Sequence, residues 1–265
     1  MTETFLDKIF AAKGKRVKEQ KEIIGVEELA ASALRVRLAS IPHRFAKSFR
    51  NTGRLDIIAE IKRASPSKGV INDNIDVASV ARSYESGGAC AISVLTEEDF
   101  FLGSMEDLRT VRRSVDLPVL RKDFVFDEFQ IYEAANAGAD AILLIAAMLN
   151  DETLERLHTL ATDILGMDAL VEVHNIGEFN RAKSLGATLI GVNNRDLHSF
   201  NVSIDVSRSL IKHAGNGAIM ISESGLRNRE EMLELQQLGF DGFLIGETLM
   251  TSLDAVSELS GLLED

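Results

Sequence analysis

A glutamate and a lysine stand two residues apart in one apolar segment. This segment, residues 57–62, places Glu60 and Lys62 among aliphatic residues and leads into the polar run 63–69. Because side chains alternate between the two faces of a β-strand, Glu60 and Lys62 are predicted to point the same way, toward the interior. An unpaired charge in a dry core is very costly, so the pair indicates a functional site rather than a packing accident.

Other apolar segments also end in polar or ionisable residues. They are 117–121 followed by Lys122 and Asp123, 169–171 followed by Glu172, 189–192 followed by Asn193 to Asp196, and 219–221 followed by Ser222 to Gly225. Parallel strands that each carry chemistry at the C-terminal end are typical of an eight-stranded α/β barrel.

A faint internal repeat supports this architecture. Gly88, Gly138, Gly186 and Gly239 each follow an amphipathic segment and precede an apolar one. Glycine at a helix C-terminus supplies the left-handed conformation that turns the chain back toward a sheet. The copies recur about every 50 residues, and the units between them imply about eight strand-helix units. A doubly wound open sheet would give a similar pattern, but eight units favour closure.

The predicted fold is therefore an α/β fold, a (β/α)8 TIM barrel. We expect residues 1–265 to form a single domain, with residues 1–52 as an N-terminal helical extension. A length of 265 residues suits one such barrel. The predicted strands are 56–62, 91–95, 119–121, 141–146, 169–173, 189–192, 218–222 and 242–245.

The extension contains two features that invite interpretation. The basic run from Lys13 to Lys21 is interpreted as a solvated helix face in preference to a binding patch. Phe45 and Phe49, with basic residues between them, either fold over the barrel mouth or plug its lower end.

Composition excludes several classes of function. The net charge of -12 argues against a broad nucleic-acid surface, since phosphate backbones attract excess Lys and Arg. The five histidines are scattered without the spacing of a zinc site, and no nucleotide-binding glycine motif is present. The sequence thus predicts neither a metal nor a cofactor.

Targeting signals are also lacking. Cys90 is the only cysteine, which suits a reducing compartment, and its apolar surroundings predict a buried structural thiol. The N-terminus has acidic residues where a signal peptide needs basic ones. The longest apolar stretch, 141–149, is far shorter than the roughly 20 residues that span a bilayer. We expect a cytoplasmic protein that does not enter membranes and is a monomer or a weak homo-oligomer.

Phosphate is the ligand that the residues favour. In barrels of this kind the loops after the seventh and eighth strands often bind a phosphate, and here those loops contain Gly225 and Gly246. Glycine lets the backbone approach closely, and a following helix N-terminus adds partial positive charge. Ser65, near Lys62, could complete the site. The alternative is that both glycines serve only as turn residues.

Lys122 and Glu172 form a second constellation. They end different strands and would converge at one mouth, where a lysine can donate a proton and a carboxylate can accept one. The alternative is a structural ion pair between Lys122 and either Glu60 or Glu172.

Seven segments together resemble the indole-3-glycerol phosphate synthase family of tryptophan biosynthesis, and the resemblance covers essentially the whole chain. They are 57–69, 93–97, 120–124, 172–174, 190–197, 222–225 and 245–247. The resemblance implies a carboxy-lyase that closes the ring of 1-(2-carboxyphenylamino)-1-deoxyribulose 5-phosphate, a small phosphorylated substrate. Carbon dioxide and water are lost, and indole-3-glycerol phosphate is formed.

The family pattern also implies catalytic roles. Lys122 would be the general acid that protonates the ribulose carbonyl, and Glu172 the base of later steps. Lys62 would engage the substrate carboxylate and could act as a second acid. Glu60 and Asn193 would position hydroxyl groups and the lysines.

The remaining implied residues bind the substrate. Arg195 and Ser224 would line the site, and Phe101 and Phe124 could clamp the aromatic ring, although core packing explains these two equally well. The implied phosphate-binding residues are Ser65, Gly225, Gly246 and Glu247, the last through its backbone amide.

Three other functions fit parts of the pattern. A Schiff-base aldolase would use Lys122 as a nucleophile. Phosphoribosylanthranilate isomerase shares the fold but would need a cysteine at a strand end, whereas Cys90 precedes its strand. A non-catalytic phosphosugar-binding barrel would have no need for Glu60, Lys62, Lys122 and Glu172 in one mouth.

Overall fold

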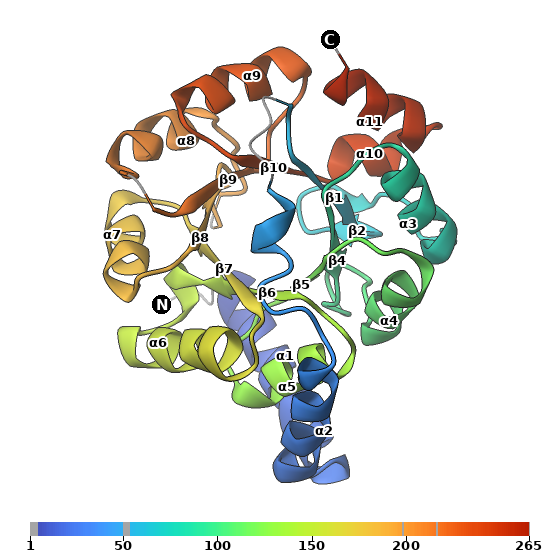
Figure 1. Cartoon of the computed structure of the whole chain (residues 1–265), viewed down its shortest axis with the longest axis vertical. Coiled ribbons are helices and arrows are strands. Elements are labelled where there is room, and N and C mark those ends of the chain that lie inside the picture. The colour runs from blue at the N-terminus through green and yellow to red at the C-terminus, as the bar shows by residue number, and fades with distance from the viewer. Residues whose placement is uncertain (1–4, 50–53, 198, 216, 265) are drawn as a thin grey trace.

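The computed structural model describes residues 5–49, 54–197, 199–215 and 217–264. Within these residues eight parallel strands close into a barrel in the order β1-β10-β9-β8-β7-β6-β5-β4, and helices surround it (Figure 1). The barrel strands are β1 Ile57–Ile61, β4 Ala91–Leu95, β5 Val119–Lys122, β6 Ala141–Ile145, β7 Asp168–Val173, β8 Leu189–Asn193, β9 Ile219–Glu223 and β10 Gly242–Ile245. The predicted barrel is confirmed, and the open sheet is excluded because β1 pairs with both β4 and β10.

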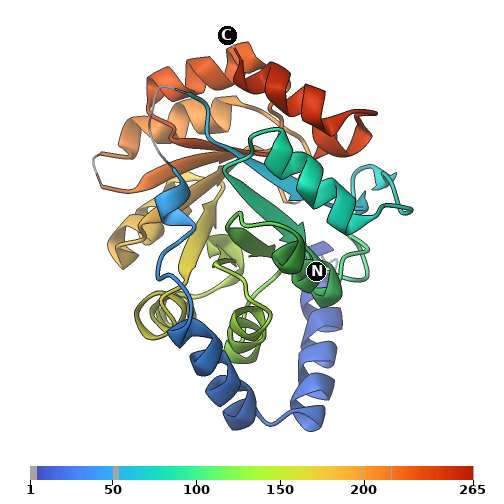
Figure 2. The same ribbon diagram turned by 45° about the vertical axis from the view of Figure 1, so that its right-hand side comes forward.

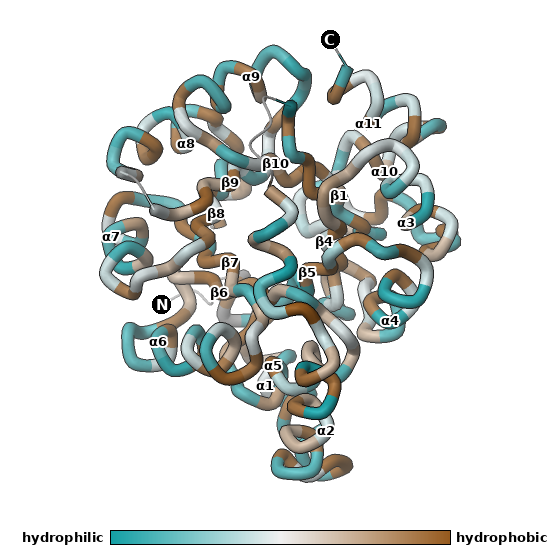
Figure 3. The backbone as a smooth tube through the Cα atoms, in the orientation of Figure 1, coloured by the Kyte–Doolittle hydropathy of each residue, from teal (hydrophilic) through white to brown (hydrophobic). Residues whose placement is uncertain are grey.

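Helices follow the strands around the outside. They are α3 Val77–Ser86, α4 Met105–Ser114, α5 Glu128–Asn136, α6 Asp151–Thr159, α7 Ile176–Leu185, α8 Asp205–Leu210, α9 Arg229–Leu238, α10 Glu247–Thr251 and α11 Ala255–Leu263. Short helical turns lie at η1 Ala46–Ser48, η2 Ala146–Met148, η3 Leu160–Ile164 and η4 Ile211–His213, and a small hairpin of β2 Ala64–Ser65 and β3 Gly69–Val70 follows β1. Figure 3 shows the hydrophobic residues concentrated along the central strands.

The four glycines of the internal repeat adopt the predicted left-handed conformation. Gly88, Gly138, Gly186 and Gly239 all have positive φ angles, between 78° and 116°, where the chain leaves a helix for the next strand. Left-handed backbone of this kind strongly favours glycine.

Three barrel strands end one residue later than predicted. β5 includes Lys122, β8 includes Asn193 and β9 includes Glu223. These polar side chains are therefore anchored on paired strands rather than on loops, which holds them with greater precision.

The N-terminal extension forms two helices, α1 Phe5–Ile23 and α2 Val26–Leu38, which lie beside α5 (Figure 2). Within the described residues, no helix is both long and apolar enough to cross a membrane.

The solvated-face interpretation of the basic run in α1 is wrong for Lys13, whereas Arg16 and Lys21 are partly exposed and paired with carboxylates. Lys13 is buried and lies 2.9 Å from Asp123, which directly follows Lys122. Arg16 pairs with Asp99, and Lys21 lies 2.7 Å from Asp127. Charged side chains on this face are therefore partners for carboxylates at the barrel rim. Lys15, in contrast, is 79% exposed at its side chain.

Phe45 plugs the lower end of the barrel. It is fully buried and packs in one cluster with residues at the N-terminal strand ends, including Ile58, Ala91 and Leu189. The ring of Phe49 meets it edge-on at 5.6 Å. The plug interpretation is thus confirmed, and the mouth interpretation is wrong.

Two polar contacts lock this plug, and the cysteine lies beside it. Asp168 accepts a hydrogen bond from the backbone amide of Ala46 and pairs with His43 at 3.2 Å. Cys90 packs against the same cluster, but it is only partly buried, where the sequence predicted a buried thiol.

Replacing the plug ring is expected to cost stability. Phe45→Ala leaves a cavity in the lower core and should lower the free energy of unfolding by about 3–5 kcal/mol, measured by urea denaturation. Leu38→Ala is the control, because Leu38 is 87% exposed, and should change it by less than about 0.5 kcal/mol. A loss below about 1 kcal/mol for Phe45→Ala would contradict the plug.

Candidate active site

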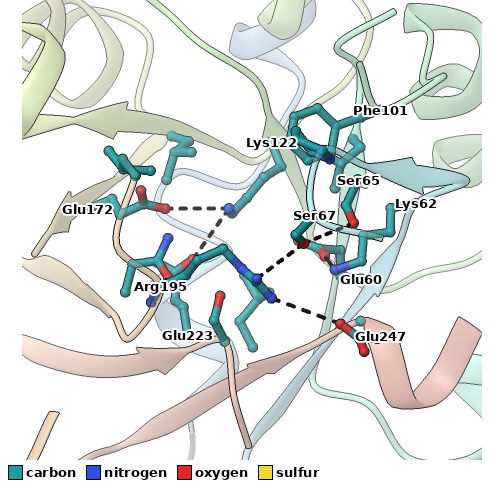
Figure 4. Close-up of a pocket in the computed structure, with 18 of the residues that line it drawn as sticks. Glu60, Lys62, Ser65, Ser67, Phe101, Lys122, Glu172, Arg195, Glu223 and Glu247 are labelled. Carbon is teal, nitrogen blue, oxygen red and sulfur yellow. Dashed lines mark hydrogen bonds and ion pairs between the residues drawn. The ribbon is translucent and has the colours of Figure 1, made fainter. Parts of the chain in front are cut away.

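A cavity of about 150 Å³ lies at the C-terminal ends of the barrel strands (Figure 4). The predicted site residues all line it. They are Glu60, Lys62, Ser65, Phe101, Lys122, Phe124, Glu172, Asn193, Arg195, Ser224, Gly225, Gly246 and Glu247. The structure therefore brings together side chains that are up to 187 residues apart in the chain, from Glu60 to Glu247.

Glu60 and Lys62 form the first charged pair. The Lys62 Nζ lies 2.9 Å from Glu60 Oε1, as the same-face prediction requires. Burial alone would raise the pKa of Glu60, but the charges of Lys62 and Lys122 outweigh it and lower that pKa. Glu60 is therefore an anion in the ligand-free cavity.

Lys122 is held between two carboxylates. Its Nζ lies 3.4 Å from Glu172 Oε2 and 3.4 Å from Glu223 Oε2 (Figure 4). Burial opposes a charged amine, but the negative potential of Glu223, Glu172 and Glu60 raises the pKa of Lys122 above its ordinary value. The lysine is consequently protonated and has an N–H to donate toward the cavity.

Glu223 is the important residue that the sequence reasoning missed: it falls within the polar run 222–225 after an apolar strand, but no role was predicted for it. It is 1% exposed, and burial together with the nearby carboxylates raises its pKa to about 8 despite Lys122. Three like charges in one dry site cannot all ionise at little cost, so Glu223 keeps its proton near neutral pH. Its place at the end of β9, like that of Glu172 at the end region of β7, was the available signal.

Glu172 shows the opposite behaviour. Burial alone would raise its pKa, but Lys122 and the imidazole of His174, 3.3 Å away, lower it to about 2, with Asn193 contributing. Glu172 and Glu223 thus differ in protonation although they share Lys122. Two carboxylates whose environments separate their pKa values are the usual mark of distinct acid and base roles.

Two glycines make room for the carboxylates. A β-carbon on Gly191, in the neighbouring strand β8, would collide with Glu223 Oε1. A β-carbon on Gly246 would lie 2.5 Å from Glu60 Oε1 and 2.9 Å from its Cβ. Gly246 is therefore required for packing against Glu60, whether or not its backbone also approaches a ligand.

The predicted phosphate-binding residues lie on adjacent loops, because β10 pairs with both β1 and β9. Ser65 Oγ lies 3.5 Å from Ser67 Oγ, and Arg195 donates a hydrogen bond to Ser67 at 3.2 Å. Gly225 has a φ of 76° at the turn after β9. Serine hydroxyls, an arginine and glycine backbone thus face one side of the cavity.

The carboxylate of Glu247 is already engaged. It lies 3.1 Å from Lys68 Nζ and 3.9 Å from Arg195. Since two cations hold the carboxylate, only its backbone amide at the start of α10 suits an anionic ligand.

Part of the cavity lining is apolar. The rings of Phe101 and Phe124 lie 6.1 Å apart in a tilted arrangement, with Leu143 and Ile145 nearby in the lining. The loop that carries Phe101 is fixed by Glu97, whose buried carboxylate accepts hydrogen bonds from three successive backbone amides, 99–101. The cavity thus combines an aromatic wall with an anion site and with acidic and basic side chains.

Sequence reasoning also missed other parts of the lining. Leu6 and Ile9 reach the cavity from α1, and Leu197 and Phe200 from the loop after β8. Their apolar character gave no signal, because it also fits ordinary core packing. Among the described residues, no three His, Cys, Asp or Glu side chains are grouped as metal ligands.

Comparison with known proteins agrees with this geometry. The family model described as indole-3-glycerol phosphate synthase matches residues 6–262. The chain belongs to the indole-3-glycerol phosphate synthase family. A relative of that name from Carboxydothermus hydrogenoformans is 45% identical, covering 98% of this chain and 99% of its own length. Another from Neisseria meningitidis serogroup B is 44% identical, covering 97% and 98%.

Solved structures with low sequence identity share the fold. Thiamine phosphate pyrophosphorylase from Pyrococcus furiosus superposes with a TM-score of 0.56 at 17% identity, covering 79% of this chain and 94% of that one. A mandelate oxidase mutant gives 0.59 at 18% identity, covering 87% and 82%. At this identity the likeness concerns the barrel alone.

Gly191→Ala is expected to lower catalytic activity by displacing Glu223. The added methyl group displaces the carboxylate, so kcat should fall by about a hundredfold, measured in steady state, while stability drops by about 1–3 kcal/mol. Gly14→Ala is the control, because nothing lies within 4 Å of its β-carbon in α1, and it should leave kcat unchanged. Parent-like kcat in Gly191→Ala would show that the position of Glu223 is unimportant.

The raised pKa of Glu223 predicts a pH dependence of stability. From its ordinary value of 4.5 up to about 8, the folded protein holds a proton that the unfolded chain has lost. The free energy of unfolding therefore falls as pH rises through this window. Glu223→Gln cannot titrate, so the stability of the parent relative to this variant should decline from about pH 5 to about pH 8 in urea denaturation. Parallel curves for the two proteins would mean that Glu223 has an ordinary pKa.

Proposed function

We infer that the chain catalyses the reaction of its family, with the catalytic groups in the roles that the cavity supports. The substrate 1-(2-carboxyphenylamino)-1-deoxyribulose 5-phosphate closes to indole-3-glycerol phosphate with loss of carbon dioxide and water. The observation that carries this inference is the charged Lys122 between Glu172 and Glu223, in a cavity that aromatic rings and the proposed anion-binding residues also line.

Ring closure needs an acid at the ketone. As the aromatic carbon attacks the carbonyl carbon, negative charge develops on the carbonyl oxygen, and a proton must reach it. We propose Lys122 as this donor, because its ammonium group is protonated and partly open to the cavity. Asn193 and Glu60 are proposed to position the substrate hydroxyl groups and the two lysines.

Later steps need a base and a second acid. Loss of carbon dioxide returns the electrons of the broken carbon-carbon bond to the six-membered ring, which becomes aromatic again. Dehydration then removes a hydroxyl group as water and a proton from the neighbouring carbon. Glu172 is ionised and suits the base, whereas Lys62 lies across the cavity, where it can meet the substrate carboxylate or donate a proton. A protonated Glu223 can return a proton to Lys122.

We propose that substrate binding uses both the polar and the apolar parts of the cavity lining. The phosphate group is assigned to Ser65, Gly225, Gly246 and the backbone amide of Glu247, with Arg195 and Ser224 at its border. The aromatic ring is assigned to the apolar wall formed by Phe101 and Phe124.

A Schiff-base mechanism is disfavoured by the same electrostatics. A lysine nucleophile must lose its proton, but the surrounding carboxylates raise the pKa of Lys122. The isomerase alternative also lacks support, because Cys90 directly precedes β4 and so lies at the N-terminal end of that strand, away from the cavity.

Finer features are proposed from composition. We propose that residues 1–265 act as one domain and that the protein works in the cytoplasm as a monomer or weak homo-oligomer. The net charge of -12 further disfavours nucleic acid as a partner.

The proposed roles predict selective losses of activity. The assay follows the fluorescence of the indole product without added metal. In this assay kcat should fall by about 10²–10⁴-fold for Lys122→Met and for Glu172→Gln. Lys15→Met is the control, since Lys15 is 79% exposed on α1, and it should match the parent. Substrate bound without turnover by the parent protein would favour a binding protein instead. Activity retained in Lys122→Met would exclude Lys122 as the acid.

A further inference from the structure

His174 approaches the oxygen of the Glu172 carboxylate that does not face Lys122. Its Nε2 lies 3.3 Å from Glu172 Oε1, while Lys122 approaches the other oxygen, Oε2. The two carboxylate oxygens therefore have different partners. One faces the imidazole, and the other faces the lysine and the cavity.

Glu178 fixes the other side of the imidazole. Its Oε2 lies 3.1 Å from His174 Nδ1 and accepts the backbone amide of His174 at 2.8 Å. Asn175, the N-cap of α7, donates to the second oxygen of Glu178 and accepts a hydrogen bond from the Glu178 amide. The beginning of α7 thus holds Glu178, and Glu178 holds the ring.

The chain Glu172, His174 and Glu178 runs from the buried cavity to the start of a helix. The side chains are 2%, 11% and 14% exposed in that order. Burial opposes a charged imidazole, but its contacts with Glu172 and Glu178 raise the pKa of His174 to about 10. These two carboxylates, from β7 and α7, are the charged groups that act on the ring, while Lys122 and Glu223 lie beyond Glu172.

We propose that His174 is a positioning residue for Glu172: anchored by Glu178, its imidazole holds one carboxylate oxygen so that the other faces Lys122 and the cavity. At metal sites a carboxylate often orients the histidine that binds the metal. Here the roles are exchanged, because the histidine orients the carboxylate. A carboxylate held from behind loses little rotational freedom and keeps its reactive oxygen aimed. This inference rests on the proposed role of Glu172 as the base.

A pair of amide substitutions separates the two contacts of the ring. His174→Gln places a donor near the position of Nε2, toward Glu172, whereas His174→Asn retains a donor only near Nδ1, toward Glu178. We expect His174→Asn to lower kcat by about tenfold or more with KM within about twofold, and His174→Gln to retain most of the parent kcat. Thermal denaturation of both variants shows whether they fold.

A double-mutant cycle with Glu172→Gln excludes a general structural role. If His174 acts only through Glu172, adding His174→Asn to Glu172→Gln should change the single-turnover rate by less than about twofold. The proposal is overturned if His174→Asn leaves kcat unchanged, or if it lowers the rate equally in both backgrounds. A parent-like rate in Glu172→Gln alone would instead refute the proposed base, so the two failures are distinguishable.

Discussion

The constraint on which the rest of the structure depends is the burial of five ionisable side chains in one mouth of the barrel. Glu60, Glu172 and Glu223 would carry three negative charges, and Lys62 and Lys122 carry two positive ones. Buried charges are tolerated only when they are paired, so one carboxyl keeps its proton. Glu223 is that group, and the resulting cluster is neutral, with a proton donor and a proton acceptor on either side of Lys122.

The scaffold serves this cluster by fixing its neighbours. Strand ends carry the charged groups, and Gly191 and Gly246 leave space where two carboxylates must lie. From outside, Lys13 of α1 binds Asp123 next to Lys122, and that carboxylate also pairs with Arg121 at 3.0 Å. The N-terminal extension is therefore part of the support for the site, in addition to closing the lower end of the barrel through Phe45.

Features that depend on local sequence could be predicted, and features that depend on distant partners could not. Strand alternation placed Glu60 beside Lys62, and the glycines before strands revealed the repeat, because both signals lie within a few residues. The sequence did not reveal the burial of Lys13, because its partner Asp123 is 110 residues away in the chain. The protonation of Glu223 likewise depends on charges from three other strands. The assignment of roles rested on the family pattern, because charge pairs alone also fit a structural network.

The most direct test of this account is infrared spectroscopy of the ligand-free enzyme near neutral pH, comparing the parent with Glu223→Gln in the region of the protonated carboxyl stretch. The account predicts one such band in the parent that is absent from the variant and disappears as pH rises through about 8. Absence of this band in the parent at neutral pH would mean that all three carboxylates are ionised. That result would contradict the neutral cluster from which the acid and base roles follow.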